Sequence, residues 1–216
     1  MIVLFFLLFF GTIMFLVFYF SKEAVIKRKL NKVQATPINQ CQNGEEVKII
    51  GEVEIFGEPL VSPLSDRECC HYYVLVEQKV SSGKSSKWKK IIEEEKSSHV
   101  MINDGTGKAL IDTTTRLKSH IVQDANFKSG FMNDATDKLE NYLNQHNIKS
   151  EGFFGFNKTI RYKEGILEQG EAVAVLGKAE WRNLESSDED RILTIRAAEE
   201  GGKVYLSDDE KVTRKK

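Results

Sequence analysis

The sequence has little cysteine and no excess of either charge. Its 216 residues contain three cysteines, Cys41, Cys69 and Cys70, and 31 basic against 32 acidic residues. Three cysteines cannot form a disulfide framework, and the adjacent Cys69 and Cys70 pair poorly because neighbouring Cβ atoms point apart. The balanced charge argues against a dedicated nucleic-acid surface, which needs a basic excess. We therefore expect neither a disulfide-stabilised domain nor a nucleic-acid partner.

The first twenty residues contain no charged side chain. From Ile2 to Phe20, only a glycine, a threonine and a tyrosine interrupt a run of Ile, Val, Leu, Met and Phe. A helix of this length would measure roughly 28 Å, close to the hydrocarbon thickness of a bilayer. Residues 1–21 are therefore predicted to form a transmembrane anchor.

A cleaved signal peptide is the alternative to an anchor. Signal peptides have a basic start, a shorter apolar core and a small-residue cleavage site, whereas here no Lys or Arg precedes the run and Ser21-Lys22-Glu23 follows it. Residues 22–44 have the composition of a basic juxtamembrane helix and linker. Basic residues beside a span tend to stay in the cytoplasm. The pattern predicts a single-pass membrane protein with its N-terminus outside and its soluble domain cytoplasmic.

After residue 44 the sequence has the period-two pattern of β-strands. Apolar and charged residues alternate from Val47 to Ile55, and His71 to Val80 is rich in aromatic and β-branched residues. Asp104-Gly105 between two short apolar runs is a strong hairpin signal. A helical pattern, with Asp134 as its expected N-cap, interrupts the strands once.

These patterns predict the fold class of the soluble part. Residues 45–207 are expected to form a mainly β domain of about eight strands with one inserted helix, as an OB-like or other closed barrel or a sandwich. Small closed sheets bury their alternating apolar positions and avoid exposed edges. Residues 208–216 are polar and are expected to form a disordered tail.

Three later stretches carry a family resemblance. EPLVSPLSDRECCHYY (58–73), NDGTGKALID (103–112) and RYKEGILEQGEAVAVLG (161–177) occur in this order. They resemble the GIDE domain, also called BAM for "beside a membrane", over roughly residues 45–206. The positions that carry the resemblance are Ser62, Pro63, Leu64, Ser65, Cys69, Asp104, Gly107, Glu164, Gly170 and Gly177.

The resemblance implies a membrane-bound β-domain. The best-known members are mitochondrial membrane-anchored ubiquitin ligases with a C-terminal RING. A RING binds two zinc ions through eight Cys or His ligands, whereas this sequence holds three Cys and four His. We therefore expect no ligase chemistry and no cofactor. The residues above are expected to be structural, with Glu164 accepting hydrogen bonds from backbone N–H groups.

A few residues suggest chemistry, each with a structural alternative. Cys69 and His71 lie two apart on a predicted strand and could offer two zinc ligands from one face, although Cys69 also fits a small buried side chain. His99, His120 and His146 could activate a Ser or Cys only if the fold brought them together.

Two aromatic groups suggest contacts with other molecules. Phe153, Phe154 and Phe156 lie near glycines and could enter a bilayer, bind a partner or pack in the core. Trp88 could stack on a nucleic-acid base, although lysines around it more commonly protect a sheet edge. Those lysines are Lys84, Lys87, Lys89 and Lys90.

Together these features predict a non-catalytic module that binds an unidentified protein at the membrane surface. The alternatives from other classes are a ligase-like enzyme and an OB-like nucleic-acid binder.

Overall fold

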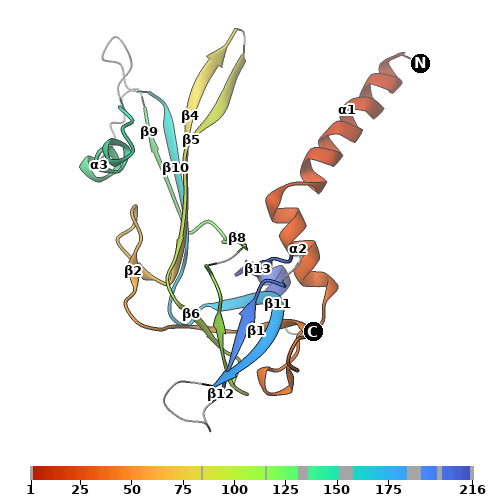
Figure 1. Ribbon diagram of the computed structural model, residues 1–216. Coiled ribbons are helices and arrows are strands. Elements are labelled where there is room, and N and C mark those ends of the chain that lie inside the picture. The colour runs from red at the N-terminus through yellow and green to blue at the C-terminus, as the bar shows by residue number, and fades with distance from the viewer. Residues whose placement is uncertain are drawn as a thin grey trace. The chain divides into compact units, whose positions relative to one another are not determined.

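The computed structural model describes residues 2–83, 85–114, 116–130, 136–150, 158–183, 191–198 and 201–214 (Figure 1). The chain forms two compact units, each assembled from separate stretches of sequence. The barrel unit comprises residues 1–52, 101–120 and 172–216, and the sheet unit comprises residues 53–100 and 121–171. The prediction of a mainly β protein with a closed barrel is confirmed, whereas the single domain expected over residues 45–207 divides into these two units.

The barrel unit is built around a closed five-stranded barrel. Its strands follow one another in the order β1-β6-β7-β12-β11, and β11 pairs antiparallel with β1 to close the ring. The pairing of β7 with β12 is parallel. The bounds are β1 Glu46–Ile55, β6 Val100–Asn103, β7 Lys108–Ile111, β11 Ala172–Asn183 and β12 Arg191–Arg196.

Two short strands extend the barrel sheet beyond β11. Strand β13, Val204–Ser207, pairs antiparallel with β11, and β8, Leu117–His120, pairs parallel with β13. Strand β8 is too short and polar to show a clear period-two pattern, which is why the sequence did not predict it.

Three helices belong to the barrel unit, in addition to the 3-10 turn η1, Ile38–Gln40. Helix α1 is Ile2–Tyr19, α2 is Lys22–Lys32, and α4 is Glu210–Thr213. Ser21 separates the first two helices and caps α2, because its Oγ accepts a hydrogen bond from Ala24 N at 3.2 Å. In the part of the chain that the structure describes, no single helix is long and apolar enough to cross a membrane. The pair Leu8–Tyr19 and Lys22–Lys32, bent by 63°, meets that test of length and composition together.

Helix α2 lies against β8, β11 and β13 (Figure 1), and α4 lies against α2 and β11. A shared apolar cluster contains Ile26 and Leu30 of α2, Val212 of α4, and Ala174 and Leu176 of β11. This cover explains why successive residues of β11 are buried on both faces, a pattern that a half-exposed strand would not show.

Both ends of the barrel unit differ from the sequence-based expectation. Helix α2 is part of the folded unit, so folding extends N-terminal to the expected boundary at residue 45. The tail, expected to be disordered, forms α4 with Val212 only 1% exposed. A helix of one turn needs only a single buried side chain to pack against the fold. A single apolar residue such as Val212 gives no clear signal in a polar sequence.

The sheet unit contains an antiparallel four-stranded sheet in the order β5-β4-β10-β9. A short hairpin of β2 and β3 accompanies it. The bounds are β2 Leu60–Val61, β3 Glu68–Cys69, β4 His71–Ser82, β5 Ser85–Ser97, β9 Ala125–Ser129 and β10 Ile160–Leu167.

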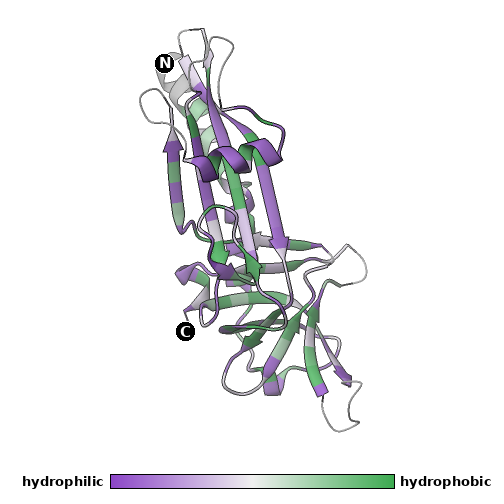
Figure 2. Cartoon of the chain, turned by 90° about the vertical axis from the view of Figure 1, so that its left-hand side faces the viewer, coloured by the Kyte–Doolittle hydropathy of each residue, from purple (hydrophilic) through white to green (hydrophobic). Residues whose placement is uncertain are grey.

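Helix α3, Asp137–Gln145, lies across one face of this sheet (Figure 2). Its buried residues Leu139, Tyr142 and Leu143 join the apolar core formed by β4 and β10. The N-cap is Thr136, whose Oγ1 accepts a hydrogen bond from Leu139 N at 3.4 Å. The expected cap, Asp134, lies outside the described residues.

Candidate functional site

The SPLS loop and Glu164, 100 positions apart, meet in the sheet unit. Glu164 is 1% exposed, and its Oε1 accepts a hydrogen bond from Leu64 N at 2.8 Å. Within the loop, the hydroxyls of Ser62 and Ser65 lie 2.7 Å apart. Glu164 Oε2 is buried without a hydrogen-bond partner among the described residues. The arrangement fixes the loop on β10 and makes no nucleophile more reactive.

The three thiols are poor nucleophiles. Burial raises the pKa of Cys41 to about 11, that of Cys69 to about 11 and that of Cys70 to about 12. The carboxylate of Glu164 adds to the effect on Cys69. Because these pKa values lie far above 7, each thiol is almost fully protonated at neutral pH. The thiolate, which is the reactive form, is therefore scarce.

His71 lies beside Ser97 on the neighbouring strand, a pair that the sequence did not reveal. Its Nδ1 is 2.5 Å from Ser97 Oγ, and its Nε2 is 3.7 Å from Glu95 Oε1. His71 and Ser97 are directly opposite in the β4–β5 register. The imidazole is 0% exposed, so a substrate cannot reach it, and the contact holds the two strands in register. Among the described residues, neither Cys69 nor His71 belongs to a group of three or more His, Cys, Asp or Glu side chains close enough to share a metal ion.

Asp104 organises the hairpin between β6 and β7. Its Oδ1 accepts hydrogen bonds from Thr106 N at 2.8 Å and Gly107 N at 3.1 Å, and its Oδ2 accepts one from Ile38 N at 2.8 Å. Burial alone would raise the pKa of Asp104, but these backbone donors lower it. At Gly107 a Cβ would lie 2.9 Å from the Ile38 side chain, so a side chain there would disturb this contact.

The other two glycines of the resemblance also mark backbone geometry. Gly170 has φ +84° in the turn before β11, and its N–H donates to Val53 O at 2.8 Å. At Gly177 a Cβ would lie 2.7 Å from the side chain of Ile195 on β12. Both positions are therefore structural in the described chain.

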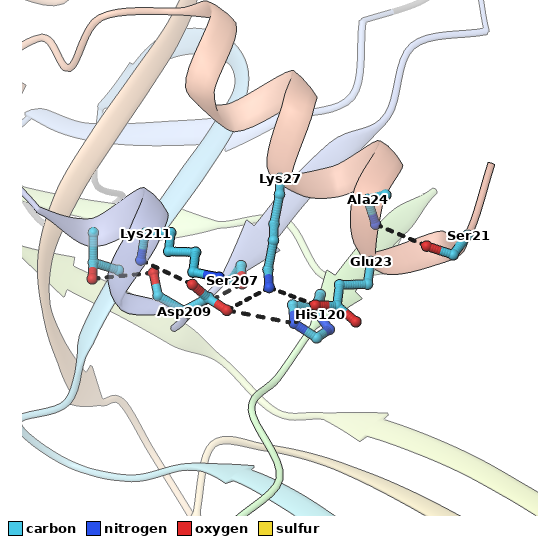
Figure 3. A network of polar contacts seen from close by, with 9 residues as sticks. Ser21, Glu23, Ala24, Lys27, His120, Ser207, Asp209 and Lys211 are labelled. Atoms are coloured by element: carbon cyan, nitrogen blue, oxygen red, sulfur yellow. Dashed lines mark hydrogen bonds and ion pairs between the residues drawn. The ribbon is translucent and has the colours of Figure 1, made fainter. Parts of the chain in front are cut away.

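A polar network of the barrel unit joins α2, β8 and the N-cap of α4 (Figure 3). Lys27 Nζ lies 2.5 Å from Glu23 Oε1 and 2.6 Å from Asp209 Oδ2. His120 Nε2 lies 3.8 Å from the same Glu23 oxygen and 4.0 Å from the same Asp209 oxygen. Asp209 also caps α4 through Lys211 N at 2.8 Å.

The charges of this network shift one another's titration. The hydrogen bond with Lys27 lowers the pKa of Glu23. Burial would raise the pKa of Asp209 and lower that of Lys27, but their mutual hydrogen bond reverses both shifts. Burial lowers the pKa of His120, against the opposing charge of Glu23. The network therefore holds two carboxylates and one ammonium charged beside a neutral imidazole at physiological pH.

The same residues offer the geometry of a metal site. Ligand atoms of Glu23, His120 and Asp209 lie within 4.8 Å of one another. The ammonium of Lys27 bonds to both carboxylates, however, so a divalent cation would have to displace it. The contacts of this network attach α2 and α4 to the barrel. Sequence signals for it were the Glu23–Lys27 spacing of four and an acidic cap before α4.

A second carboxylate network lies in the sheet unit. Glu94 Oε1 accepts a hydrogen bond from Tyr72 O–H at 2.5 Å, and Oε2 accepts one from Tyr142 O–H at 2.7 Å. His146 Nε2 is 3.2 Å from the same Oε2. Burial, together with Glu94, raises the pKa of both tyrosines, so they remain neutral donors. This network ties α3 to β4 and β5.

The structure describes Trp88 but not the three phenylalanines that the sequence suggested as contact residues. The guanidinium of Arg161 lies 4.2 Å from the ring centroid of Trp88, and Arg161 Nε is 2.6 Å from Glu77 Oε2. One face of Trp88 is therefore already occupied by the sheet unit's own side chain. Phe153, Phe154 and Phe156 lie outside the described residues, and so does Lys84.

The barrel unit contains a cleft of about 990 Å³. Its walls come from the end of α2, the extended segment 33–37, strand β1, the β6–β7 turn and α4. Its charged residues are Lys32, Lys48, Asp104, Lys211 and Arg214. The sequence placed these residues in four separate segments, so no local pattern could bring them together.

No family model, curated protein or solved structure matches the chain.

Proposed function

We propose that this chain is a membrane-tethered, non-catalytic β-module that binds a partner protein at the membrane surface. The observation that carries the proposal is the exposure of α1. All its side chains from Leu8 onward are exposed although most are large and apolar, with Phe18 73% and Phe10 61% exposed. An apolar surface of this kind needs cover by lipid or protein.

The attachment of α2 supports a tether rather than a loose leader. Ile26 and Leu30 are buried in the barrel unit, and Lys27 pairs with Asp209. Helix α2 therefore connects the apolar helix firmly to the folded unit. The basic residues of α2 favour a cytoplasmic position for the folded part and an outside position for the N-terminus.

The chemistry of the described residues supports binding rather than turnover. The three thiols are protonated, and the imidazole beside Ser97 is fully buried. The closed five-stranded barrel with its parallel β7–β12 pair supports the hypothesis of an OB-like barrel, an architecture used by many binding modules. The resemblance to the GIDE/BAM domain favours the same position beside a membrane.

The tether is tested by extraction of cell membranes at alkaline pH after expression of the full chain. We expect the wild type to stay in the pellet at its full length. The double variant Phe10→Lys/Met14→Lys should move to the soluble fraction, because each Lys near a helix centre costs about 2.5–3.5 kcal/mol of insertion free energy. The matched control is Phe10→Leu/Met14→Leu, which keeps the apolar character and should remain in the pellet.

Orientation is read by adding protease to intact cells. A cytoplasmic folded part stays uncut until the membrane is permeabilised. Recovery of the wild type in the soluble fraction, shortened at its N-terminus, would reject the tether and with it the proposed function.

A further inference from the structure

The cleft of the barrel unit has a one-sided charge. Four of its residues are cations, Lys32, Lys48, Lys211 and Arg214, and one is an acid, Asp104. Both carboxylate oxygens of Asp104 already accept backbone hydrogen bonds, from Ile38, Thr106 and Gly107. These donors keep Asp104 ionised, but four cationic side chains against one carboxylate leave the charged lining of the cleft net positive.

The positive charge is distributed along the cleft rather than gathered at one point. Lys32 ends α2, Lys48 lies on β1, and Lys211 and Arg214 belong to α4 or follow it. Lys48 is only 5% exposed, which places one cation deep in the wall, whereas Lys32 and Lys211 are exposed. Arg214 bonds to Glu210, but both side chains are more than three-quarters exposed, so water screens this pair strongly.

One wall of the cleft is an extended backbone segment. Residues 33–37 all line it, Val33 has extended φ and ψ, and Ala35 forms a parallel bridge with Lys48. Extended backbone beside a groove is the geometry to which a peptide adds as a further strand. The apolar side chains of Val33, Pro37 and Ile50 lie among the polar ones.

We propose that this cleft binds an acidic segment of a partner protein in an extended conformation. The inference rests on the proposed function as a partner-binding module and names the chemistry of the partner. The volume of the cleft is at the upper end of the roughly 300–1,000 Å³ that sites for drug-sized ligands span. A single phosphate group would therefore leave most of the cleft filled by water. A chain with several carboxylates can meet cations that are spread along the cleft, and its backbone can pair with the extended wall.

The test measures fluorescence anisotropy of a labelled octapeptide of alternating Asp and Glu, titrated with the full chain in a neutral detergent. We expect saturable binding that weakens as salt is added. The variant Lys32→Gln/Lys211→Gln removes two exposed cations of the cleft and should weaken binding about tenfold or more. The matched control, Lys87→Gln/Lys89→Gln, removes two exposed lysines of β5 and should change affinity less than about twofold. Unchanged near-ultraviolet circular dichroism shows that both variants are folded.

Three outcomes would overturn the proposal. The first is no binding of the peptide, and the second is an equal loss in the cleft variant and the control. The third is equal competition by tripolyphosphate or an eight-residue oligothymidylate, which would identify a general anion site. Membrane extraction of the same protein distinguishes the tether from the cleft. If the chain stays in the pellet but does not bind the peptide, only the cleft proposal is rejected.

Discussion

The two units attach helices to their sheets through carboxylates that have different partners. In the barrel unit, Glu23 and Asp209 share the ammonium of Lys27, so each carboxylate is paired with an opposite charge. In the sheet unit, Glu94 accepts hydrogen bonds from two neutral tyrosine hydroxyls. Salt screens ion pairs but affects neutral donors little. The first attachment should therefore respond to salt and pH, and the second to the loss of an acceptor.

Apolar packing is common to both attachments. Helix α2 buries Ile26 and Leu30 against the barrel, and α3 buries Leu139 and Leu143 against the four-stranded sheet. Burying a Leu or Ile side chain contributes about 1.5–3 kcal/mol, more than a partly exposed ion pair. The polar networks therefore set the position of each helix, while most of the stabilisation comes from the apolar contacts.

The two tryptophans allow each unit to be followed separately. Trp181 lies on β11 of the barrel unit, and Trp88 lies on β5 of the sheet unit. The sequence contains only these two. In the Trp88→Phe background, fluorescence during urea unfolding reports on the barrel unit, and in the Trp181→Phe background it reports on the sheet unit. Full-length chain in detergent is used throughout.

The largest expected effect is the loss of an apolar contact of α2. Leu30→Ala should lower the free energy of unfolding of the barrel unit by about 2–5 kcal/mol, because it removes a fully buried side chain and leaves a cavity. The sheet unit should be unchanged. The control Asn31→Ala alters the neighbouring exposed position and should cost less than about 0.5 kcal/mol. A similarly small cost for Leu30→Ala would mean that the ion pairs, not packing, hold α2.

The elements that the sequence predicted are those with local signals. Strand β1, the hairpin around Asp104 and helix α3 each follow from a period, a turn or a set of apolar spacings within a dozen residues. The sequence predicted Asp134 as the cap of this helix, whereas in the structure Thr136 caps it. Short strands such as β8 and β9 gave too few residues for a period to be visible.

Pairings between distant segments were beyond the sequence. The division into two units depends on β10 pairing with β4 and β9, while the next strand, β11, pairs with β1. Nothing local to Leu167 or Ala172 specifies that change of partner. His120 and Asp209 likewise meet only because β8 pairs with β13, just before α4. The membrane tether and the resemblance remain predictions.

In the sheet unit, Glu94→Ala should have the next largest effect. It removes the acceptor of two buried tyrosine hydroxyls, and each unsatisfied buried hydroxyl costs about 1–3 kcal/mol. Because both hydrogen bonds are only partly buried, we expect a combined loss near the lower end, about 2–3 kcal/mol, that is the same at low and high salt. Glu94→Gln keeps one acceptor oxygen and should lose less. A strong salt dependence of either loss would contradict the distinction between the two units.

Asp209→Asn tests the ionic attachment with a smaller effect. The amide can still cap α4 but no longer pairs as an anion with Lys27. The barrel unit should lose about 1 kcal/mol at low salt and less than half of that at about 1 M salt, because the pair is only partly buried. Asp209→Ala, which also removes the cap, should cost about 1 kcal/mol more at every salt concentration. Equal losses of Asp209→Asn at both salt concentrations would show that its charge does not matter.

The smallest expected effect is the pH dependence contributed by His120. Burial lowers its pKa below the usual 6.5, against the charge of Glu23, and Lys27 and Lys22 act in the same direction as burial. A His with a lowered folded pKa contributes stability that is present above its unfolded pKa and lost as pH falls through the folded pKa. The barrel unit of the wild type should therefore lose stability as the pH falls below the unfolded pKa of about 6.5 toward the lower folded pKa, and His120→Gln should lose less.

The two carboxylates of the same network titrate at lower pH than the imidazole, so their effects on stability can be told apart. Glu23 and Asp209 have pKa values below their usual 4.5 and 3.8, so their contribution is present above those values and is lost only in stronger acid. Unfolding of the barrel unit, followed by Trp181 fluorescence at half-unit pH steps, distinguishes the two ranges. If His120→Gln kept the wild-type slope near pH 6, the imidazole would not be the titrating group. The stability of the ionic attachment would then begin to fall only when Glu23 and Asp209 are protonated.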